Sequence, residues 1–231
     1  MSFDLSVILS YFPTLLLGAW LTVKLVIFSS IAGVCLAFPL GLGRSSPRPA
    51  VKALPWLFIF FFRGTPLLVQ LFLVYYGLAQ FDFVRASILW PILRDPYWCA
   101  LITMALNTGA YIAEILRGAI QAVPRGEIEA GISVGMSKSL VLRRIVLPRA
   151  IRIALPAYSN EVILMLKCSA LASTITLLEL TGTARTIIAK TYMPVEIFLV
   201  TGVFYLVISY CLVKIFQVAE WRLNRHRRAN G

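Results

Sequence analysis

The chain carries the segment Gly126-Glu-Ile-Glu-Ala-Gly-Ile-Ser-Val-Gly-Met-Ser-Lys-Ser-Leu-Val-Leu-Arg-Arg-Ile-Val-Leu-Pro148 between two long apolar runs, Tyr97–Leu116 and Ile153–Ala172. Apolar residues recur in this segment at roughly helical spacing, at positions Ile128, Ile132, Met136, Leu140 and Ile145. Basic residues fill much of its second half. The pattern does not match a membrane span or an ordinary loop. It predicts two short helices on the water side of a membrane protein, apolar on one side and basic on the other.

The composition of the whole chain also indicates a membrane protein. Of its 231 residues, 59% are hydrophobic and 14% are charged, whereas soluble domains carry about 25% charged residues. So few charges cannot cover the surface of a water-soluble domain. The net charge of +12 would favour a nucleic-acid partner for a soluble protein. In a membrane protein it indicates basic cytoplasmic loops instead, so we expect no nucleic-acid partner.

The cysteines and the single histidine form no pattern typical of a metal site or a disulfide framework. The four cysteines lie in or near apolar runs, without CxxC spacing, and His226 lies in a basic tail. We therefore expect buried thiols, a solvated histidine, no metal ion and no cofactor on this chain. Residues 1–6 lack the positive region of a signal peptide, so the first apolar run is expected to remain as an anchor.

Five apolar runs are long enough to cross a bilayer as helices, which takes about 20 residues. They cover residues 21–42 (with an alternative start at Leu15), 54–78 (interrupted by Arg63-Gly64-Thr65-Pro66), 97–116, 153–172 and 195–218. Helices are expected because an open strand would leave its backbone unsatisfied in lipid. The sequence therefore predicts an all-α, multi-pass membrane protein. It forms a single transmembrane domain over residues 1–231, with a loop at about 123–148.

The basic residues of the loops predict the orientation in the membrane. Of the 22 lysines and arginines, 14 lie in the loop at 42–54, the loop at 116–153 and the C-terminal tail. The opposite loops carry four: Arg85, Arg94, Arg185 and Lys190. Because cytoplasmic loops are enriched in lysine and arginine, we expect the N-terminus outside and the C-terminus in the cytoplasm. An odd number of spans requires such opposite ends.

The loop at 123–148 contains signals for two helices that meet at an angle. Val123-Pro124-Arg125-Gly126 is a helix-breaking turn, and Glu127 and Glu129 follow where negative charge suits the helix dipole. Gly131 and Gly135 lie one turn apart and allow close backbone approach. We expect Leu147-Pro148 to end the element. From the residues alone, a helix lying on anionic headgroups is an alternative.

The spacing in this loop resembles the coupling-loop signature of bacterial ABC importer permeases. That signature is Glu-Ala-Ala, three residues, Gly, nine residues and Ile-x-Leu-Pro. The corresponding residues here are Glu129-Ala130-Gly131, Gly135, Ile145 and Leu147-Pro148. Gly131 departs from the usual alanine, and we expect a small residue to fit there. The topological position of the loop, between the third and fourth spans, agrees with this resemblance.

Three further segments resemble the polar amino-acid subfamily of these permeases. They are Phe62–Gln70, which contains Arg-Gly-Thr-Pro, then Leu106–Gly118 and Leu155–Lys167. The last resembles most the permeases for histidine, arginine, lysine/ornithine and opines. The resemblance covers about residues 15–222, and its motifs are more specific for the family than for the substrate.

The resemblance implies a type I ABC importer permease fold and a set of partners. Two permease chains, identical or related, would form the pore in the bacterial inner membrane, and a periplasmic binding protein would deliver the amino acid. An ATPase dimer would grip the coupling helices and bind ATP and Mg, since this chain has no phosphate-binding loop and is not expected to be an enzyme. The ATPase-coupling residues would be Glu127, Glu129, Ala130, Gly131, Gly135, Ile145, Leu147 and Pro148.

Polar groups inside the spans are candidates for the substrate pathway, because each charge there costs about 2.5–3.5 kcal/mol on insertion scales. Glu161 lies near mid-depth and is expected to hold a cationic substrate. The other candidates are Asn160, Arg63, Lys167 and Asn107. The alternative for these charges is pairing within the chain, Arg63 with Glu161 or Glu114 with Arg117. Arg63 is expected either to contact a substrate carboxylate or to lie at the cytoplasmic surface.

These observations favour the permease subunit of an ATP-driven importer for a polar, basic amino acid or an opine. The alternative is a self-contained channel or ion-coupled carrier whose basic loop binds lipid. Five spans are few for a carrier, and no paired half-helices are apparent. A membrane enzyme has little support, because no cluster of histidine, cysteine and carboxylates faces one side of the membrane.

Overall fold

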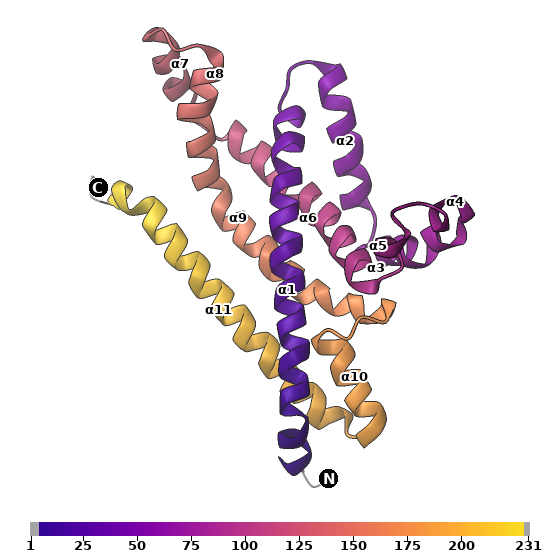
Figure 1. Ribbon diagram of the computed structural model, residues 1–231. Helices are drawn as coiled ribbons and strands as arrows, with labels where there is room; N and C mark the ends of the chain where they lie inside the picture. Colours follow the sequence, from indigo (N-terminus) through magenta and orange to yellow (C-terminus); the bar gives the residue numbers. More distant parts are fainter. Residues whose placement is uncertain (1–4, 229–231) are drawn as a thin grey trace.

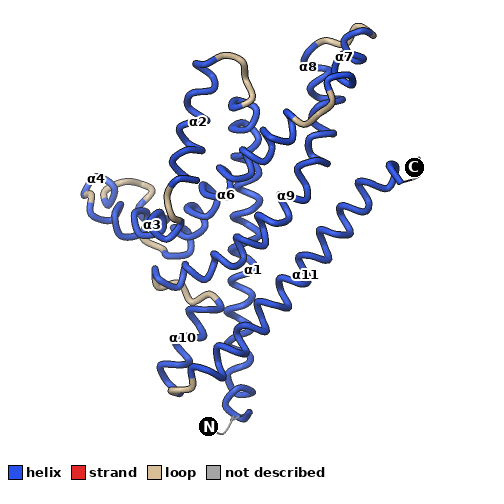
Figure 2. Tube along the Cα trace, turned by 180° about the vertical axis from the view of Figure 1, so that it is seen from behind, coloured by secondary structure: helices blue, strands red, loops and turns tan. Residues whose placement is uncertain are grey.

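The computed structural model describes residues 5–228, and it describes side chains between residues 7 and 223. This part of the chain is helical, with short connections (Figures 1 and 2). The α-helices are α1 Leu5–Arg44, α2 Pro49–Gly64, α3 Leu67–Phe72, α4 Asp82–Arg85, α5 Trp90–Leu93, α6 Pro96–Gln121, α7 Arg125–Ser133, α8 Lys138–Val141, α9 Leu147–Cys168, α10 Leu180–Thr191 and α11 Pro194–Arg228. Two π-helical turns, η1 Leu73–Gly77 and η3 Leu142–Val146, and two 3₁₀ segments, η2 Leu78–Gln80 and η4 Ser169–Ile175, join or extend them.

Three helices in the described part are long and apolar enough to cross a membrane without a break: α1, α6 and α11. The number of candidate spans rises to as many as five if each of two bent helix pairs forms one span. One pair is α2 with residues 67–80, bent by 102°, and the other is residues 138–175 with α10, bent by 50°. The all-helical expectation is therefore confirmed for the described residues, but the expected second span is broken after Gly64, and the helix of the expected fourth span is followed by a bend before α10.

The first and second spans differ from their expected bounds. α1 begins at Leu5 rather than near residue 21, because the apolar sequence continues upstream and packs on α10 and α11. The run at 54–78 is not one helix. α2 begins at Pro49 and ends at Gly64, where Thr65 is extended with φ −115° and ψ 143°. A residue before proline avoids the α conformation, and Pro66 has no N–H to continue the helix.

The fourth span also starts earlier than expected, and Leu147-Pro148 does not end the preceding element. These residues form the first turn of α9, which continues from α8 through the π-turn η3. A proline inside an α-helix removes a hydrogen bond and crowds the preceding turn. The π-helical turn η3 directly precedes Leu147-Pro148 and is wider than an α-helical turn. It therefore accommodates the proline, and the helix continues from α8 into α9. After Cys168 the helix tightens into η4 instead of ending at residue 172.

α6 is the central helix of the fold, with 67% of its most apolar stretch buried against the rest of the chain. α1 lies close along it because glycines meet at the contact: a Cβ on Gly33 would lie 2.5 Å from Thr108 Cγ2. Small residues allow such close approach between membrane helices. The corresponding stretch of α11 is 17% buried, and in Figure 1 this helix diverges from the others toward the C-terminus.

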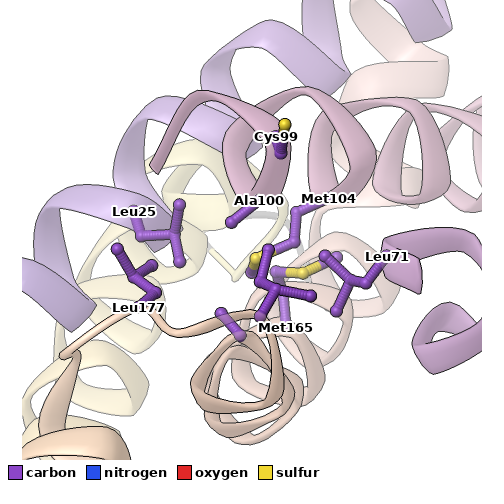
Figure 3. Packing of buried hydrophobic residues seen from close by; sticks show 9 residues of the cluster. Leu25, Leu71, Cys99, Ala100, Met104, Met165 and Leu177 are labelled. Carbon is purple, nitrogen blue, oxygen red and sulfur yellow. The ribbon is translucent and has the colours of Figure 1, made fainter. Parts of the chain in front are cut away.

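The main apolar core joins α1, α3, α6, α9 and η4 (Figure 3). Leu25, Leu71, Met104, Met165 and Leu177 converge there from separate elements. Figure 1 shows α7, α8 and the end of α11 at one end of the molecule, and the start of α1 with α10 at the other. The core lies between these ends.

Candidate functional site

The loop segment forms a compact two-helix element at the end of α6. α7 ends in a Schellman turn: the Gly135 N–H donates to the Ile132 carbonyl at 2.9 Å, and the Met136 N–H donates to the Gly131 carbonyl at 3.1 Å. Gly135 has φ +82°, a left-handed conformation that glycine adopts without steric cost. The Ser137 hydroxyl then accepts the Leu140 N–H at 3.3 Å and caps α8. The sequence motif places glycine where this turn requires it.

Gly131 allows the second half of the element to pack directly on α7. It is buried, and a Cβ there would lie 2.6 Å from Ile145 Cδ1 and 3.3 Å from Val141 Cγ2. An alanine therefore requires the tip of the Ile145 side chain to shift. The permeases that this chain resembles usually have alanine at this position. Here the glycine allows the Ile145 side chain to approach the α7 backbone more closely.

The element has an inner and an outer face. Ile128, Met136 and Ile145 pack on the cluster that includes Leu116 and Val123, which ties the element to α6. The outer face exposes Glu129, Ala130, Ile132 and Val134, the last two at 52% and 78%. Ile132, which the spacing assigns to the same apolar face as Ile128, lies on this outer face. Exposed aliphatic side chains at the tip of a helix are suited to a groove on a partner.

The two glutamates at the start of α7 have different surroundings. Glu127 pairs with Arg149 at 3.3 Å between carboxylate and guanidinium, so it links α7 to the first turn of α9. Glu129 is exposed. Glu127 therefore braces the element, whereas Glu129 is available on its surface.

A cavity of about 550 Å³ lies between the break after α2, the middle of α6 and the second half of α9. Arg63, Asn107 and Glu161 all line it, so the structure brings these three predicted residues together from three helices. Glu161 and Asn107 are 8% and 6% exposed. The other two candidates, Asn160 and Lys167, are exposed and do not line the cavity.

The two predicted charge pairs have different outcomes. Arg117 Nε donates to Glu114 Oε1 at 2.8 Å, which confirms the pair on α6. Arg63 and Glu161 form no ion pair within the described side chains. The guanidinium of Arg63 instead lies over the Tyr111 ring, 5.1 Å from its centroid, an arrangement that suits a cation and an aromatic face. Glu161 therefore lines the cavity without an ion-pair partner among the described side chains.

Gln70 forms hydrogen bonds that connect the residues of the cavity wall, a role that the sequence did not predict. Its amide nitrogen donates to the Phe62 carbonyl at 2.9 Å and the Thr65 carbonyl at 3.0 Å, which the helix break leaves without helical partners. Asn107 Nδ2 donates to Gln70 Oε1 at 3.0 Å and to the Phe62 carbonyl at 3.2 Å. Two amides thus satisfy the broken backbone and hold α6 to α2 and α3. The sequence contained one signal for this role: a glutamine lies four residues after a proline inside an apolar run.

The comparisons with known proteins agree with this architecture. Residues 31–225 match the model of the family described as "Binding-protein-dependent transport system inner membrane component". The chain belongs to this family, whose members are the membrane permease components of ABC importers.

Within the family the chain is similar to permeases of amino-acid and opine systems. It is 50% identical over 228 residues to the octopine transport system permease protein OccM of Rhizobium meliloti, covering 99% of this chain and 93% of the relative. It is 45% identical over 210 residues to the histidine/lysine/arginine/ornithine transport system permease protein HisM of Escherichia coli K12, covering 90% and 88%. A chain in the crystal structure of an amino acid ABC transporter with histidines superposes with a TM-score of 0.85 at 34% identity, covering 96% of this chain and all of that one.

Proposed function

We propose that this chain is one of the two permease subunits of an ATP-driven importer that carries a cationic amino acid or an opine across the bacterial inner membrane. The relationship to OccM along 99% of the chain carries the proposal. Octopine and the amino acids named for HisM contain guanidinium, ammonium or imidazole groups. The chain holds a carboxylate, Glu161, in a cavity large enough for such a solute.

In this proposal the 550 Å³ cavity is the part of the substrate pathway that this chain supplies. The Glu161 carboxylate receives the cationic end of the solute, and Arg63 receives its carboxylate by charge-assisted hydrogen bonds. Asn107 lines the same wall and is held in place by Gln70. Asn160 and Lys167 lie on the exposed side of α9, where they face the second permease chain or lipid.

The outer face of α7 and its Schellman turn form the surface that docks into a partner ATPase. Glu129, Ala130, Ile132 and Val134 supply the contact, while Gly131, Gly135, Ile145, Leu147 and Pro148 shape it. Glu127 braces it through Arg149. The partner ATPase dimer binds ATP with Mg, and its closure moves α7 against the ends of α6 and α9. A periplasmic protein delivers the solute to the opposite end. The N-terminus then lies outside and the C-terminus in the cytoplasm.

Replacing Gly135 by leucine tests this coupling. Leucine at φ +82° opposes the left-handed turn, at a cost of about 1–2 kcal/mol, and alters the docking surface. We expect the ATPase activity that substrate and binding protein stimulate in reconstituted complexes to be lost, along with uptake. The matched control is Gly126→Leu, on the same element, where a Cβ meets nothing within 4 Å and φ is not positive.

Two results would contradict the proposal. One is a Gly135→Leu complex that inserts normally and still couples ATP hydrolysis to uptake. The other is a purified chain that transports solute without any ATPase subunit, which would support the channel or carrier alternative.

A further inference from the structure

A second cavity, of about 360 Å³, lies beside the first, toward the end of the molecule that carries α7 and α8. It lies between the end of α1, α2 and the second half of α6, and its walls include Arg44, Trp56, Arg63, Tyr111 and Glu114. Arg63, Gly64 and Tyr111 line both cavities. The stacked Arg63 and Tyr111 side chains therefore stand at the boundary between the two spaces.

Two charged groups on the second cavity have bonding capacity left over. Glu114 Oε1 accepts from Arg117, but Glu114 Oε2 is buried without a hydrogen-bond partner among the described residues. Arg44 Nε is likewise buried and unpartnered within that part of the chain. A buried polar atom without a hydrogen-bond partner is costly, and the two residues that carry these atoms have opposite charge. Both residues line the second cavity.

We propose that this second cavity is an inner substrate subsite, which the solute occupies after it leaves Glu161 and before it enters the cytoplasm. The inference rests on the proposed import function. Arg63 keeps hold of the solute carboxylate as it turns from one cavity to the other, and Arg44 becomes a second ligand for that carboxylate. Glu114 Oε2 receives the ammonium or guanidinium end, and the face of Tyr111 supports a cation.

The charge pattern favours a zwitterionic solute over an anionic lipid headgroup. A cavity lined by arginines alone would suit a lipid phosphate on the cytoplasmic side. Glu114 repels such a phosphate, whereas it pairs with the cationic end of an amino acid. Sharing Arg63 with the outer cavity also allows transfer without complete loss of carboxylate contacts, which lowers the barrier to movement.

Thiol protection in the assembled complex tests this inference. One reporter, Trp56→Cys, lies in the inner cavity alone, and the matched reporter, Leu164→Cys, lies in the outer cavity alone. Cys35, Cys168 and Cys211 are replaced by alanine, and Cys99 is kept because it is fully buried. The nucleotide-free complex in nanodiscs is treated with a small maleimide in the presence of L-arginine or octopine.

We expect the transported solute to protect both reporters. Glu114→Gln and, independently, Arg44→Gln should raise the solute concentration for half-protection of Trp56→Cys by about tenfold, which corresponds to about 1.4 kcal/mol. Protection of Leu164→Cys should not change. Arg117→Gln is the control, because it removes the partner of Glu114 without removing a residue that lines the cavity.

The outcomes separate the inference from the function on which it rests. If Leu164→Cys is protected and Trp56→Cys is not, or if Arg117→Gln weakens protection as much as Glu114→Gln, the inner subsite is wrong while the importer assignment stands. Protection of Trp56→Cys by phosphatidylglycerol instead of the solute would assign the cavity to lipid. If L-arginine and octopine are not taken up and protect neither reporter, the proposed substrate class is wrong, and so is the inner subsite.

Discussion

The Gln70 side chain stabilises the break between α2 and α3 inside the apolar part of the molecule. The Thr65-Pro66 step interrupts the backbone hydrogen bonding of the helix, because proline has no N–H to donate. Gln70, which is 3% exposed, donates to the Phe62 and Thr65 carbonyls and to Thr65 Oγ1 at 2.8 Å. The same residue positions Asn107 on the cavity wall. One amide therefore both satisfies the local backbone and shapes the wall of the cavity.

We expect Gln70→Leu to destabilise the chain by about 1–3 kcal/mol, because the Thr65 carbonyl loses its donor while Asn107 still donates to the Phe62 carbonyl. It should also lower solute affinity, because Asn107 loses Gln70 Oε1, one of its two acceptors. The measurement is the thermal unfolding midpoint of the detergent-purified complex, with uptake assayed in parallel. Gln80→Leu is the control, since Gln80 is exposed and makes one long bond, at 3.3 Å, to Tyr76. Equal midpoints for the two variants would refute the role of Gln70.

At the scale of elements, the N-terminus of α10 is joined to α1 and α11 by one buried carboxylate. Glu179, fully buried, caps α10 by accepting the Thr181 and Gly182 N–H groups at 2.9 and 2.8 Å. It also accepts from Thr22 of α1 at 3.3 Å and from Tyr205 of α11 at 3.1 Å. A buried charge with this many donors is satisfied in place. The cap therefore fixes the position of α10 relative to its two neighbours.

Removing one donor from this junction tests its contribution. We expect Tyr205→Phe to cost about 1.5–3 kcal/mol, the range for a hydrogen bond to a charged group, and to loosen the α10–α11 contact. Tyr210→Phe removes the same hydroxyl from the same helix at an exposed position, 63% accessible, and should leave the unfolding midpoint unchanged. Hydrogen exchange across residues 180–191 would localise the effect. No difference between the two variants would show that the junction contributes little.

At the scale of the whole molecule, the two ends are chemically different. The end with α7, α8 and the α1–α2 turn collects most of the basic residues, and the α10–α11 turn lies at the opposite end (Figure 1). This polarity is what positive-inside topology requires. It supports the proposal that α7 lies on the cytoplasmic side and docks to an ATPase there.

Impermeant thiol labelling of whole cells checks this orientation. Arg48→Cys lies at the exposed α1–α2 turn, and Tyr192→Cys lies at the α10–α11 turn, where Tyr192 is 86% exposed. With the exposed Cys35 and Cys211 replaced, we expect Tyr192→Cys to react from outside and Arg48→Cys to react after permeabilisation. The reverse pattern would place α7 outside and would refute ATPase coupling.

The sequence by itself determined that this is an all-helical membrane protein of the ABC permease family, and it predicted two short helices at about 123–148. Those features depend on local chemistry: apolar runs of bilayer length, basic loops and helix-breaking residues. The sequence assigned Gly135 to a close backbone approach, whereas the structure shows a left-handed turn there, with nothing within 4 Å of the position that a Cβ would occupy. The tertiary structure decided where the helices bend and which polar side chains meet. Arg63, Asn107 and Glu161 come from three helices, and Gln70 and Glu179 find their partners only after those helices pack. Sequence spacing cannot reveal such contacts, because they depend on the rotation and crossing of separate helices.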